Sequence, residues 1–365
     1  MEQKKVCVGV VGAGAISDIY LKNMINRFDN LYVKSICAAH IENAQKKAQE
    51  YGIQAVTMEE MYNDPEIRMI VNLTPAHVHY DVIKRALEHG KHVYTEKTLT
   101  DDINKSAELV RLAKEKGLYL GSAPDTFMGA ALQTARSAID SGMLGEIHSF
   151  AVSANRNNDI LLSLFDFLRK PGGGIVCDYA VYYVTALVSL LGPAARVGSI
   201  VGYPYPTHVN CVPGTPLYGQ TMDTPNESQV NAVLQFENGV TGTFHIDADS
   251  VMEDQAYFTI YGTKGILILT DPNQFGGQVR FLPNIPNPAD RQEPSVLQSV
   301  NEYSDNSRGI GPADLADTIL NGTPLRPSAE MAYHVHEVLN AMLEGGTSGG
   351  FTDIRSSCVR PEPLR

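Results

Sequence analysis

The chain has 365 residues, of which 43% are hydrophobic and 19% charged, so it is long enough for two domains with ordinary cores. Its formal net charge of −12 argues against nucleic acids and anionic membranes as partners, because both require a basic surface. No apolar stretch reaches the length of a membrane-spanning helix. Five scattered cysteines without metal-ligand spacing, and an N-terminus without a leader pattern, predict free thiols and a cytoplasmic location.

The first third of the chain alternates predicted strands and helices. Apolar runs typical of buried strands occupy residues 6–11, 31–39, 69–73, 92–95 and 118–122. Helical periodicity fills residues 76–90 and 101–117, and a glycine ends each of these segments. This alternation predicts an α/β fold, in which residues 1–124 form a doubly wound parallel sheet with helices on both faces.

Residues 125–365 have a different pattern. Helical segments are predicted at 131–145 and after the glycine run 172–174, and strand pairs follow. One hairpin turns at Asn238–Gly239 and another around residues 263–265. Residues 204–226 and 272–312 are rich in Pro, Gly and Asn and are interpreted as long loops. The pattern predicts an α+β domain with an open, mostly antiparallel sheet.

A glycine pair follows the first predicted strand directly. Gly12 permits a tight turn, and Gly14 lets the backbone approach a pyrophosphate at the start of the next helix. The third position of this dinucleotide fingerprint is Ser17 instead of glycine. A plain glycine turn is the alternative, but the position of the pair in a strand–helix unit favours a dinucleotide.

The second predicted strand ends without the acidic residue that binds the ribose of NAD in many dinucleotide domains. Ala38, Ala39 and His40 stand there instead. NADP is not excluded, but NAD is favoured because a 2′-phosphate requires a nearby Arg or Lys, and none replaces the missing acid.

Glu96 and Lys97 follow the predicted strand 92–95 directly. A Glu–Lys pair is common on protein surfaces. At the carboxyl end of a strand in a nucleotide-binding sheet, however, charged side chains face the ligand site. A lysine in a partly dry cleft has a lowered pKa and can accept a proton from an alcohol.

Several motifs in this order resemble the Gfo/Idh/MocA family of sugar and polyol oxidoreductases. They are the N-terminal glycine loop, Thr74-Pro75 with His79, Glu96-Lys97, and the run Gly172–Gly174 that leads to Asp178. The segments GSAPDTF (121–127) and NSRGIGPADLA (306–316) resemble one subgroup. The resemblance covers nearly the whole chain. It implies NAD-dependent oxidation of a sugar hydroxyl, a tightly bound cofactor, and a homo-oligomer that forms through the C-terminal sheet.

The resemblance also implies a set of cofactor-binding and catalytic residues. Lys97 points at the substrate hydroxyl and Glu96 orients the segment, although Thr98 stands where the family motif has proline. The residues expected to bind the cofactor are Gly12, Gly14, Ala15, Ile16, His40, Leu73, Thr74, Pro75, His79, Glu96 and Lys97.

Asp178, Tyr182 and Thr185 share one face of the predicted helix that follows the glycine run. Many family members have His at the position of Tyr182 and Asp at that of Thr185. We therefore expect Tyr182 to act as the base, with its pKa lowered by the Lys97 ammonium, and Asp178 to contact the sugar. The alternative is that the tyrosines are core residues and Lys97 alone moves the proton.

Weaker candidates complete the predicted site. Asp125, Asn155 and Arg156 are expected to contact the sugar. The pairs His77-x-His79 and His334-x-His336 lack a carboxylate–histidine cluster around them, so no metal is predicted.

The predicted activity is the oxidation of a secondary hydroxyl of a sugar, cyclitol or glycoside, and C3 of a glucose unit is the expected position. Two alternatives stay open. One is a glycoside lyase or hydrolase that retains its NAD and oxidises the sugar only transiently. The other is a non-catalytic cofactor-binding sensor, against which the presence of Lys97 and Asp178 argues.

Overall fold

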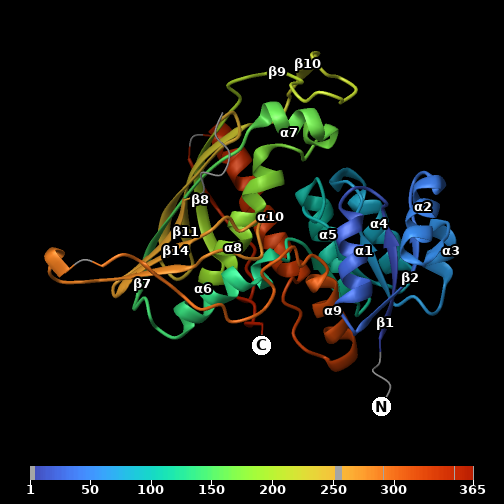
Figure 1. Ribbon diagram of the computed structural model, residues 1–365, viewed down its shortest axis with the longest axis horizontal. Helices are drawn as coiled ribbons and strands as arrows, with labels where there is room; N and C mark the ends of the chain where they lie inside the picture. The colour runs from blue at the N-terminus through green and yellow to red at the C-terminus, as the bar shows by residue number, and fades with distance from the viewer. Residues whose placement is uncertain (1–4, 251–256, 291, 349, 365) are drawn as a thin grey trace. The chain divides into compact units, whose positions relative to one another are not determined.

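The computed structural model describes residues 5–250, 257–290, 292–348 and 350–364, which form two compact units (Figure 1). The first unit comprises Met1–Met128 and Asn306–Tyr333, and the second comprises Gly129–Asp305 and His334–Arg365. The domain limits 1–124 and 125–365 stay a prediction. The structure adds that a segment distant in sequence, Asn306–Tyr333, packs with the first unit.

The first unit contains a six-stranded parallel sheet with the order β3-β2-β1-β4-β5-β6. This is the doubly wound fold that the strand–helix alternation predicts. Its strands are β1 (Val6–Val11), β2 (Leu31–Cys37), β3 (Gln54–Ala55), β4 (Met69–Asn72), β5 (His92–Thr95) and β6 (Leu120–Ser122). The connecting helices are α1 (Ser17–Asn26), α2 (Ile41–Tyr51), α3 (Met58–Asn63), α4 (His79–Glu88) and α5 (Ile103–Glu115), and a 3-10 turn, η1 (Ala76–Val78), precedes α4.

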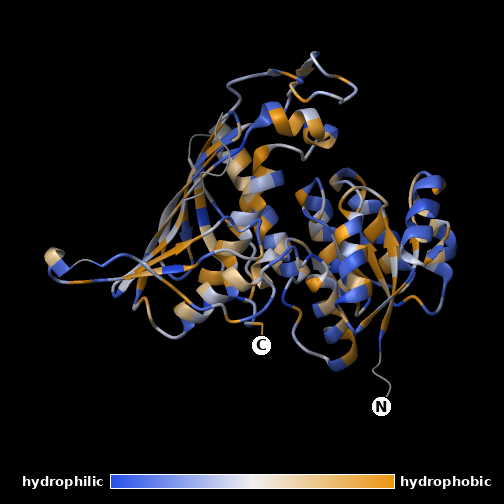
Figure 2. Ribbon diagram, viewed as in Figure 1, coloured by the Kyte–Doolittle hydropathy of each residue, from blue (hydrophilic) through white to orange (hydrophobic). Residues whose placement is uncertain are grey.

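Apolar burial and helix caps explain these elements. All four residues of β4 are buried, as expected for a strand with helices on both faces. Figure 2, coloured by hydropathy, shows hydrophobic residues along strands of the first unit. α4 directs Val82, Ile83 and Leu87 into the core below the sheet. The Asp102 side chain accepts backbone N–H groups at the start of α5, which satisfies donors that the helix itself cannot pair.

α9 (Ile310–Asn321) completes the first unit and is held there by Asp125. One carboxylate oxygen of Asp125 accepts the backbone N–H groups of Gly309 (3.2 Å) and Gly311 (3.1 Å), so it caps the helix from a distant segment. A Cβ at Gly311 would lie 2.3 Å from the Tyr94 hydroxyl, so only glycine fits there. Burial raises the pKa of Asp125 to about 6.

The second unit contains a nine-stranded sheet with the order β16-β15-β14-β13-β7-β12-β11-β8-β17. Neighbouring strands are antiparallel, except for the parallel pair β7 and β12. The strands are β7 (Ile147–Asn155), β8 (Ala194–Gly202), β11 (Gln229–Phe236), β12 (Thr241–Asp247), β13 (Tyr257–Gly262), β14 (Gly265–Leu269), β15 (Arg280–Pro283), β16 (Ser295–Val296) and β17 (Phe351–Asp353). The expected open, mostly antiparallel sheet is confirmed.

Helices cover one face of this sheet, namely α6 (Ala130–Asp140), α8 (Val181–Leu191) and α10 (Ala329–Ser348) (Figure 1). Every residue of α8 is buried, and its Tyr183 ring packs against Phe244 and Phe258 of the sheet. Along β11 buried and exposed residues alternate, so the strand has one apolar face and one exposed face.

The two segments interpreted as long loops contain short strands. Residues 204–226 form an arm with the pair β9 (Thr207–Val209) and β10 (Thr221–Asp223). His208 of this arm is buried between the carboxylates of Asp159, on α7 (Asn158–Leu164), and Asp249. Residues 272–312 include β15, β16, a 3-10 turn and the start of α9. Long-range strand pairing and side-chain contacts order these segments, and local sequence patterns do not contain that information.

Among the described residues, no helix combines the length and apolarity needed to cross a membrane.

The stability of the first unit should depend on pH through Asp125. Because its folded pKa of about 6 lies above the ordinary aspartate value of 3.8, the native state binds the proton more tightly than the unfolded chain. The stabilising contribution of protonated Asp125 to the free energy of unfolding is therefore fully present below about pH 4. It is lost as pH rises through 6, a change of about 3 kcal/mol.

The change Asp125→Asn keeps a carbonyl oxygen for the two N–H groups and removes the titration. We expect the urea-unfolding free energy of this variant to change less between pH 4 and pH 7 than that of the wild type. The exposed Asp81→Asn serves as the control and should behave as wild type. Equal pH dependence in Asp125→Asn and wild type would contradict the burial argument.

Candidate functional site

The turn between β1 and α1 fits a dinucleotide. Gly12 has a φ of +110°, and a Cβ at this position would lie 2.8 Å from the carbonyl group of Leu73. Glycine is therefore required both for the backbone conformation and for the approach of β4. Gly14 is exposed, and a Cβ there would meet no atom within 4 Å, so its backbone is open to a ligand.

Ser17, in the third fingerprint position, stabilises this turn. Its side chain is fully buried, and its hydroxyl donates to the Gly14 carbonyl oxygen at 2.6 Å. A small side chain thus replaces the third glycine without a clash. Ala15 is exposed, and Ile16 immediately precedes the first turn of α1. The backbone N–H groups at the start of α1 suit a pyrophosphate, as predicted for these residues.

His40 lies shortly after the end of β2, where many dinucleotide domains have an acidic residue that binds the ribose and this chain has none. It is exposed, directly precedes α2, and its side chain makes no capping hydrogen bond. The exposed imidazole is available to a ligand, and the contact of His40 with the cofactor stays a prediction.

The carboxyl ends of β4 and β5 are joined by the buried side chain of Asn72. Its amide nitrogen donates to the Thr95 hydroxyl at 3.0 Å, and its oxygen accepts the Thr74 hydroxyl at 2.7 Å. The Glu96 backbone N–H continues the pairing by donating to the Asn72 carbonyl at 2.9 Å. These bonds fix the segments after the two strands relative to each other.

Glu96 and Lys97 occupy the turn after β5. One oxygen of Glu96 accepts the buried Tyr20 hydroxyl of α1 at 2.7 Å, and the other accepts the Lys97 backbone N–H at 3.1 Å. The Glu96 carboxylate therefore links this turn to the helix that follows the glycine loop. Lys97 is half-buried, and the peptide bond between Lys97 and Thr98 is cis.

His79 does not face solvent at this edge of the sheet. It is fully buried, and its two ring nitrogens each lie 2.7 Å from a carbonyl oxygen, that of Thr98 for Nδ1 and that of Thr74 for Nε2. The predicted cofactor contact of His79 is not tested, but both polar atoms of its ring are already engaged. Pro75 is exposed and precedes η1.

In the second unit, Asp178 lies on a π-helical turn, η4 (Val176–Ala180), that leads into α8. The glycine run before it is required by close packing. A Cβ at Gly173 would lie 2.5 Å from the Phe167 carbonyl oxygen, and one at Gly174 would lie 2.1 Å from a Glu227 carboxylate oxygen. Asp178 is partly exposed and lines a cavity of about 20 Å³.

Glu227 lines the same cavity and was missed by the sequence analysis. Its carboxylate accepts the Val176 N–H at 3.0 Å, and its backbone carbonyl accepts the Ile175 N–H at 3.1 Å, so it caps the helical segment that carries Asp178. Burial raises the pKa of Glu227. Local sequence gives no signal for this role, because Glu227 is 51 residues from its partner in the chain.

Tyr182 is 8% exposed, and its ring lies 6.4 Å from that of Tyr179, centroid to centroid, with the two ring planes inclined by 60°. The Arg156 guanidinium lies 4.6 Å above the Tyr179 ring, and the Tyr179 hydroxyl donates to Asp271 at 2.8 Å. Asn155 donates to Ser250 at 3.0 Å. Arg156 therefore has a packing role that sequence did not indicate, and its predicted sugar contact stays a prediction.

The structure thus brings the predicted residues together in two groups. Gly12, Gly14, Thr74, Glu96 and Lys97 gather at one edge of the parallel sheet in the first unit. Asp178, Tyr182, Asn155 and Arg156 belong to the second unit, so the pairing of Lys97 with Tyr182 stays a prediction.

Two predicted residues have structural environments that sequence did not reveal. Asp125, 1% exposed, caps α9, and its enclosure argues against the predicted sugar contact. His334 accepts the Ala194 N–H and contacts Ser356. In the part of the chain that the structure describes, no group of three or more His, Cys, Asp or Glu side chains is arranged to hold a metal.

Comparison with known protein families gives two matches. Residues 6–123 match the model described as "Oxidoreductase family, NAD-binding Rossmann fold" of GFO_IDH_MocA. Residues 132–268 match the model of the GFO/IDH/MocA C-terminal domain. The two matches follow each other along the chain and together include every predicted catalytic residue.

Individual relatives are distant. The uncharacterized oxidoreductase YhhX of Escherichia coli is 32% identical over 50% of this chain and 52% of its own length, so the match spans about half of that relative. A dTDP-3,4-didehydro-2,6-dideoxy-α-D-glucose 3-reductase of Streptomyces violaceoruber is 26% identical over 75% of this chain and 80% of its own.

Among solved structures, levoglucosan dehydrogenase in complex with NADH superposes with a TM-score of 0.84. It is 18% identical, and the superposition covers 97% of this chain and 100% of the other. At this identity the likeness shows a shared fold.

Glu227 offers a test of how the Asp178 segment is held. Glu227→Gln keeps an oxygen that accepts the Val176 N–H and removes a buried charge, so we expect a urea-unfolding free energy at pH 8 that equals or exceeds that of the wild type. Glu227→Ala leaves that N–H unsatisfied and should lower the free energy of unfolding by about 1–3 kcal/mol. Equal destabilisation by the two variants would show that the hydrogen bond is not what Glu227 contributes.

Proposed function

We propose, because this chain belongs to the Gfo/Idh/MocA oxidoreductase family, that it is an NAD(H)-dependent dehydrogenase of a secondary hydroxyl on a sugar, cyclitol or glycoside. The cofactor is NAD, with the NAD-binding Rossmann domain formed by the first unit.

The observation that carries the proposal is the position of Lys97 relative to the dinucleotide turn. Gly12 packs on the segment after β4, and Asn72 joins that segment to the end of β5. Lys97 is the second residue after the end of β5. A ligand held by the glycine turn therefore has a lysine at the same edge of the sheet, where α/β proteins bind ligands.

We assign the following roles to the side chains. The start of α1 and the Gly12–Gly14 turn bind the pyrophosphate, and the nicotinamide, when bound, supplies the acceptor for the hydride of the carbinol carbon. The hydroxyl proton of the substrate passes to Tyr182, assisted by Lys97, as the carbon–oxygen double bond forms. Glu96 holds the backbone of Lys97, and Asp178 accepts a hydrogen bond from a neighbouring sugar hydroxyl.

The substrate class is supported by the names of similar proteins. One structural neighbour is named a levoglucosan dehydrogenase, and the Streptomyces relative is named a dTDP-3,4-didehydro-2,6-dideoxy-α-D-glucose 3-reductase. Both names concern sugar rings, and the second concerns position 3. We propose C3 of a glucose unit, free or within a glycoside, as the site of oxidation.

A second candidate function is considered because Glu227 and Asp178 line the same small cavity, which has room for about one water molecule. A glycoside lyase that retains NAD and oxidises its substrate transiently requires a second base, which removes the proton beside the new carbonyl. Glu227 is a candidate for that base because burial raises its pKa. Such an enzyme would cleave a glycoside without net formation of NADH.

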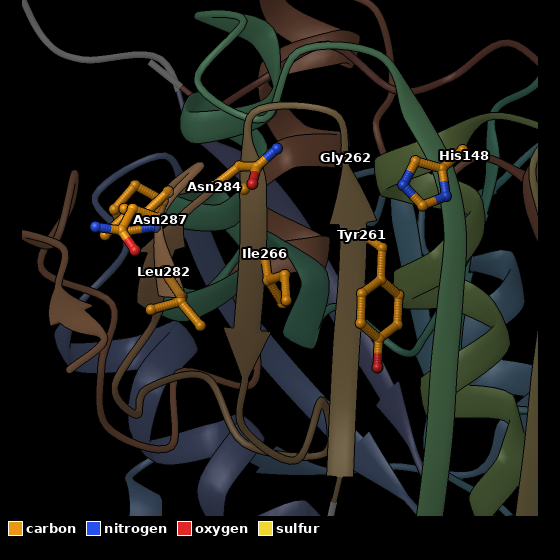
Figure 3. A pocket seen from close by; sticks show the side chains of 10 residues that line it. His148, Tyr261, Gly262, Ile266, Leu282, Asn284 and Asn287 are labelled. Atoms are coloured by element: carbon orange, nitrogen blue, oxygen red, sulfur yellow. The ribbon is translucent and has the colours of Figure 1, made fainter. Parts of the chain in front are cut away.

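The proposal includes a homo-oligomer in the cytoplasm, formed through the exposed face of the nine-stranded sheet. Ile200, Val233 and Tyr257 expose 69%, 43% and 48% of their surface on this sheet. Figure 3 shows Tyr261, Ile266 and Leu282 projecting from neighbouring strands into a hollow of about 440 Å³. Sedimentation velocity would check the assembly, and a strictly monomeric protein would contradict it.

An absorbance scan of the purified protein tests the activity directly. Glucose, myo-inositol and a simple glucoside are added in turn to protein saturated with NAD. A band near ~340 nm that appears with one of them identifies a dehydrogenase substrate. Glycoside cleavage without this band would support the lyase, and no binding of NAD or NADH would contradict both functions.

Lys97→Met should abolish detectable turnover, because it removes the amine that faces the hydroxyl and retains the length of the side chain. NADH binding, measured by fluorescence titration, should persist, since the glycine turn is intact. Lys22→Met on the exposed surface of α1 is the matched control. Normal turnover of Lys97→Met would contradict the assignment.

Tyr182→Phe should reduce kcat by about 10²–10⁴-fold, the range expected for loss of a general base. Tyr183→Phe, one residue along the same helix, is the control and should leave kcat nearly unchanged. A nearly normal rate for Tyr182→Phe would assign the proton transfer to Lys97 alone.

A further inference from the structure

One buried histidine connects the two segments that follow β4 and β5. His79 is the first residue of α4 and is 0% exposed. Its Nε2 lies 2.7 Å from the carbonyl oxygen of Thr74, which follows β4 after one residue. Its Nδ1 lies 2.7 Å from the carbonyl oxygen of Thr98, the residue that follows Lys97 in the chain. We call His79 with these two carbonyls the His79 clasp.

We propose that His79 is a positioning residue for Lys97, and that it acts through the Thr98 carbonyl rather than by contact with the cofactor. This inference rests on the proposed function for the role of Lys97 in catalysis, but the clasp itself is defined by contacts within the first unit alone.

The Lys97 turn is held from three directions. The Glu96 carboxylate bonds to the Tyr20 hydroxyl and to the Lys97 N–H, which fixes the backbone on the amino side of Lys97. The Thr98 hydroxyl donates to the Thr100 carbonyl at 2.8 Å, which stabilises the following turn. The clasp adds the bond to the Thr98 carbonyl, on the carboxyl side of Lys97, and joins it to the segment of Thr74.

The chemistry of the ring makes this contact sensitive to protonation. A neutral imidazole has one N–H and donates to one carbonyl, whereas the protonated ring donates to both. Burial lowers the pKa of His79, and the carbonyls of Thr74 and Thr98 and the nearby Glu96 carboxylate act in the opposite direction. Asn and Gln carry both donor hydrogens on one nitrogen, so they do not present nitrogens at the two separate positions that Nδ1 and Nε2 occupy beside the two carbonyls.

The test measures the pKa of the Lys97 amine and does not depend on turnover. Lysine amines are methylated with a ¹³C label, the Lys97 signal is identified by its absence in Lys97→Met, and its pKa is measured by NMR in wild type and His79→Asn. We expect the pKa of Lys97 to shift by at least about half a unit in His79→Asn, because the amine then samples a different environment. His77→Asn, two residues away and exposed, is the matched control and should show no shift.

Kinetics and binding provide the second readout. With a sugar identified by the absorbance scan, His79→Asn should lower kcat by about ten- to a hundredfold, as small misplacements of a catalytic group do. The dissociation constant of NADH should stay within about twofold of the wild-type value, because His79 does not contact the cofactor.

The outcomes separate the two proposals. An unchanged Lys97 pKa in His79→Asn, or a large loss of NADH affinity without such a shift, would overturn the role of the clasp. A shifted Lys97 pKa together with normal turnover of Lys97→Met would retain the clasp and overturn the proposed function. If His79→Asn does not fold, ¹⁵N spectra of the wild-type imidazole decide: an N–H protected from solvent exchange supports the clasp, and rapid exchange at both nitrogens overturns it.

Discussion

The hydrogen bonds of Asn72 are the interaction on which the proposed site depends most. Asn72 ends β4 and is fully buried, so its side-chain amide has to find partners inside the protein. It bonds to the Thr74 hydroxyl on one side and to the Thr95 hydroxyl on the other. Two neighbouring strands therefore leave the sheet in a defined register, and the segments that follow them are placed beside the glycine turn.

From this constraint a chain of buried polar contacts leads to Lys97. The Gly12 turn packs on the segment after β4, and Tyr20 of α1 bonds to Glu96. The two ring nitrogens of His79 each lie 2.7 Å from a backbone carbonyl oxygen, that of Thr98 and that of Thr74. Tyr20 and His79 are fully buried, so a polar atom of either one that loses its partner is left unsatisfied, at a cost of about 1–3 kcal/mol. Such a network is rigid, and rigidity is what a catalytic lysine requires of its surroundings.

In the second unit, hydrogen bonds of a buried side chain hold the segment that carries Asp178. The segment that carries it is helical, and the start of a helix leaves N–H groups without partners. Glu227 accepts one of them with its carboxylate and another with its backbone carbonyl, and Gly174 leaves the room that the carboxylate occupies. The glycine run is therefore explained by packing against Glu227 and Phe167, and a catalytic role need not be invoked for the glycines themselves.

The sequence by itself determined the elements, because each depends on neighbours in the chain. Periodicity located the strand–helix alternation, Asn238–Gly239 located a hairpin, and the glycine pair after β1 located the dinucleotide turn. The order of motifs identified the family, and Glu96–Lys97 marked the end of β5. Each of these features can be recognised from residues close together in the sequence, through the spacing of glycines, the period of apolar residues or the position of charged residues.

Only the tertiary structure decided what the buried polar side chains do. The predicted sugar contact of Asp125 stays a prediction, but the structure shows that its carboxylate caps α9 by accepting the N–H of Gly309, 184 residues further along the chain. The predicted cofactor contact of His79 also stays a prediction, and the structure places its two ring nitrogens beside two backbone carbonyls. The role of Glu227 had no signal in the sequence. The physical reason is common to the three: a buried donor or acceptor is satisfied by whichever group the fold brings near, and sequence spacing does not specify that group.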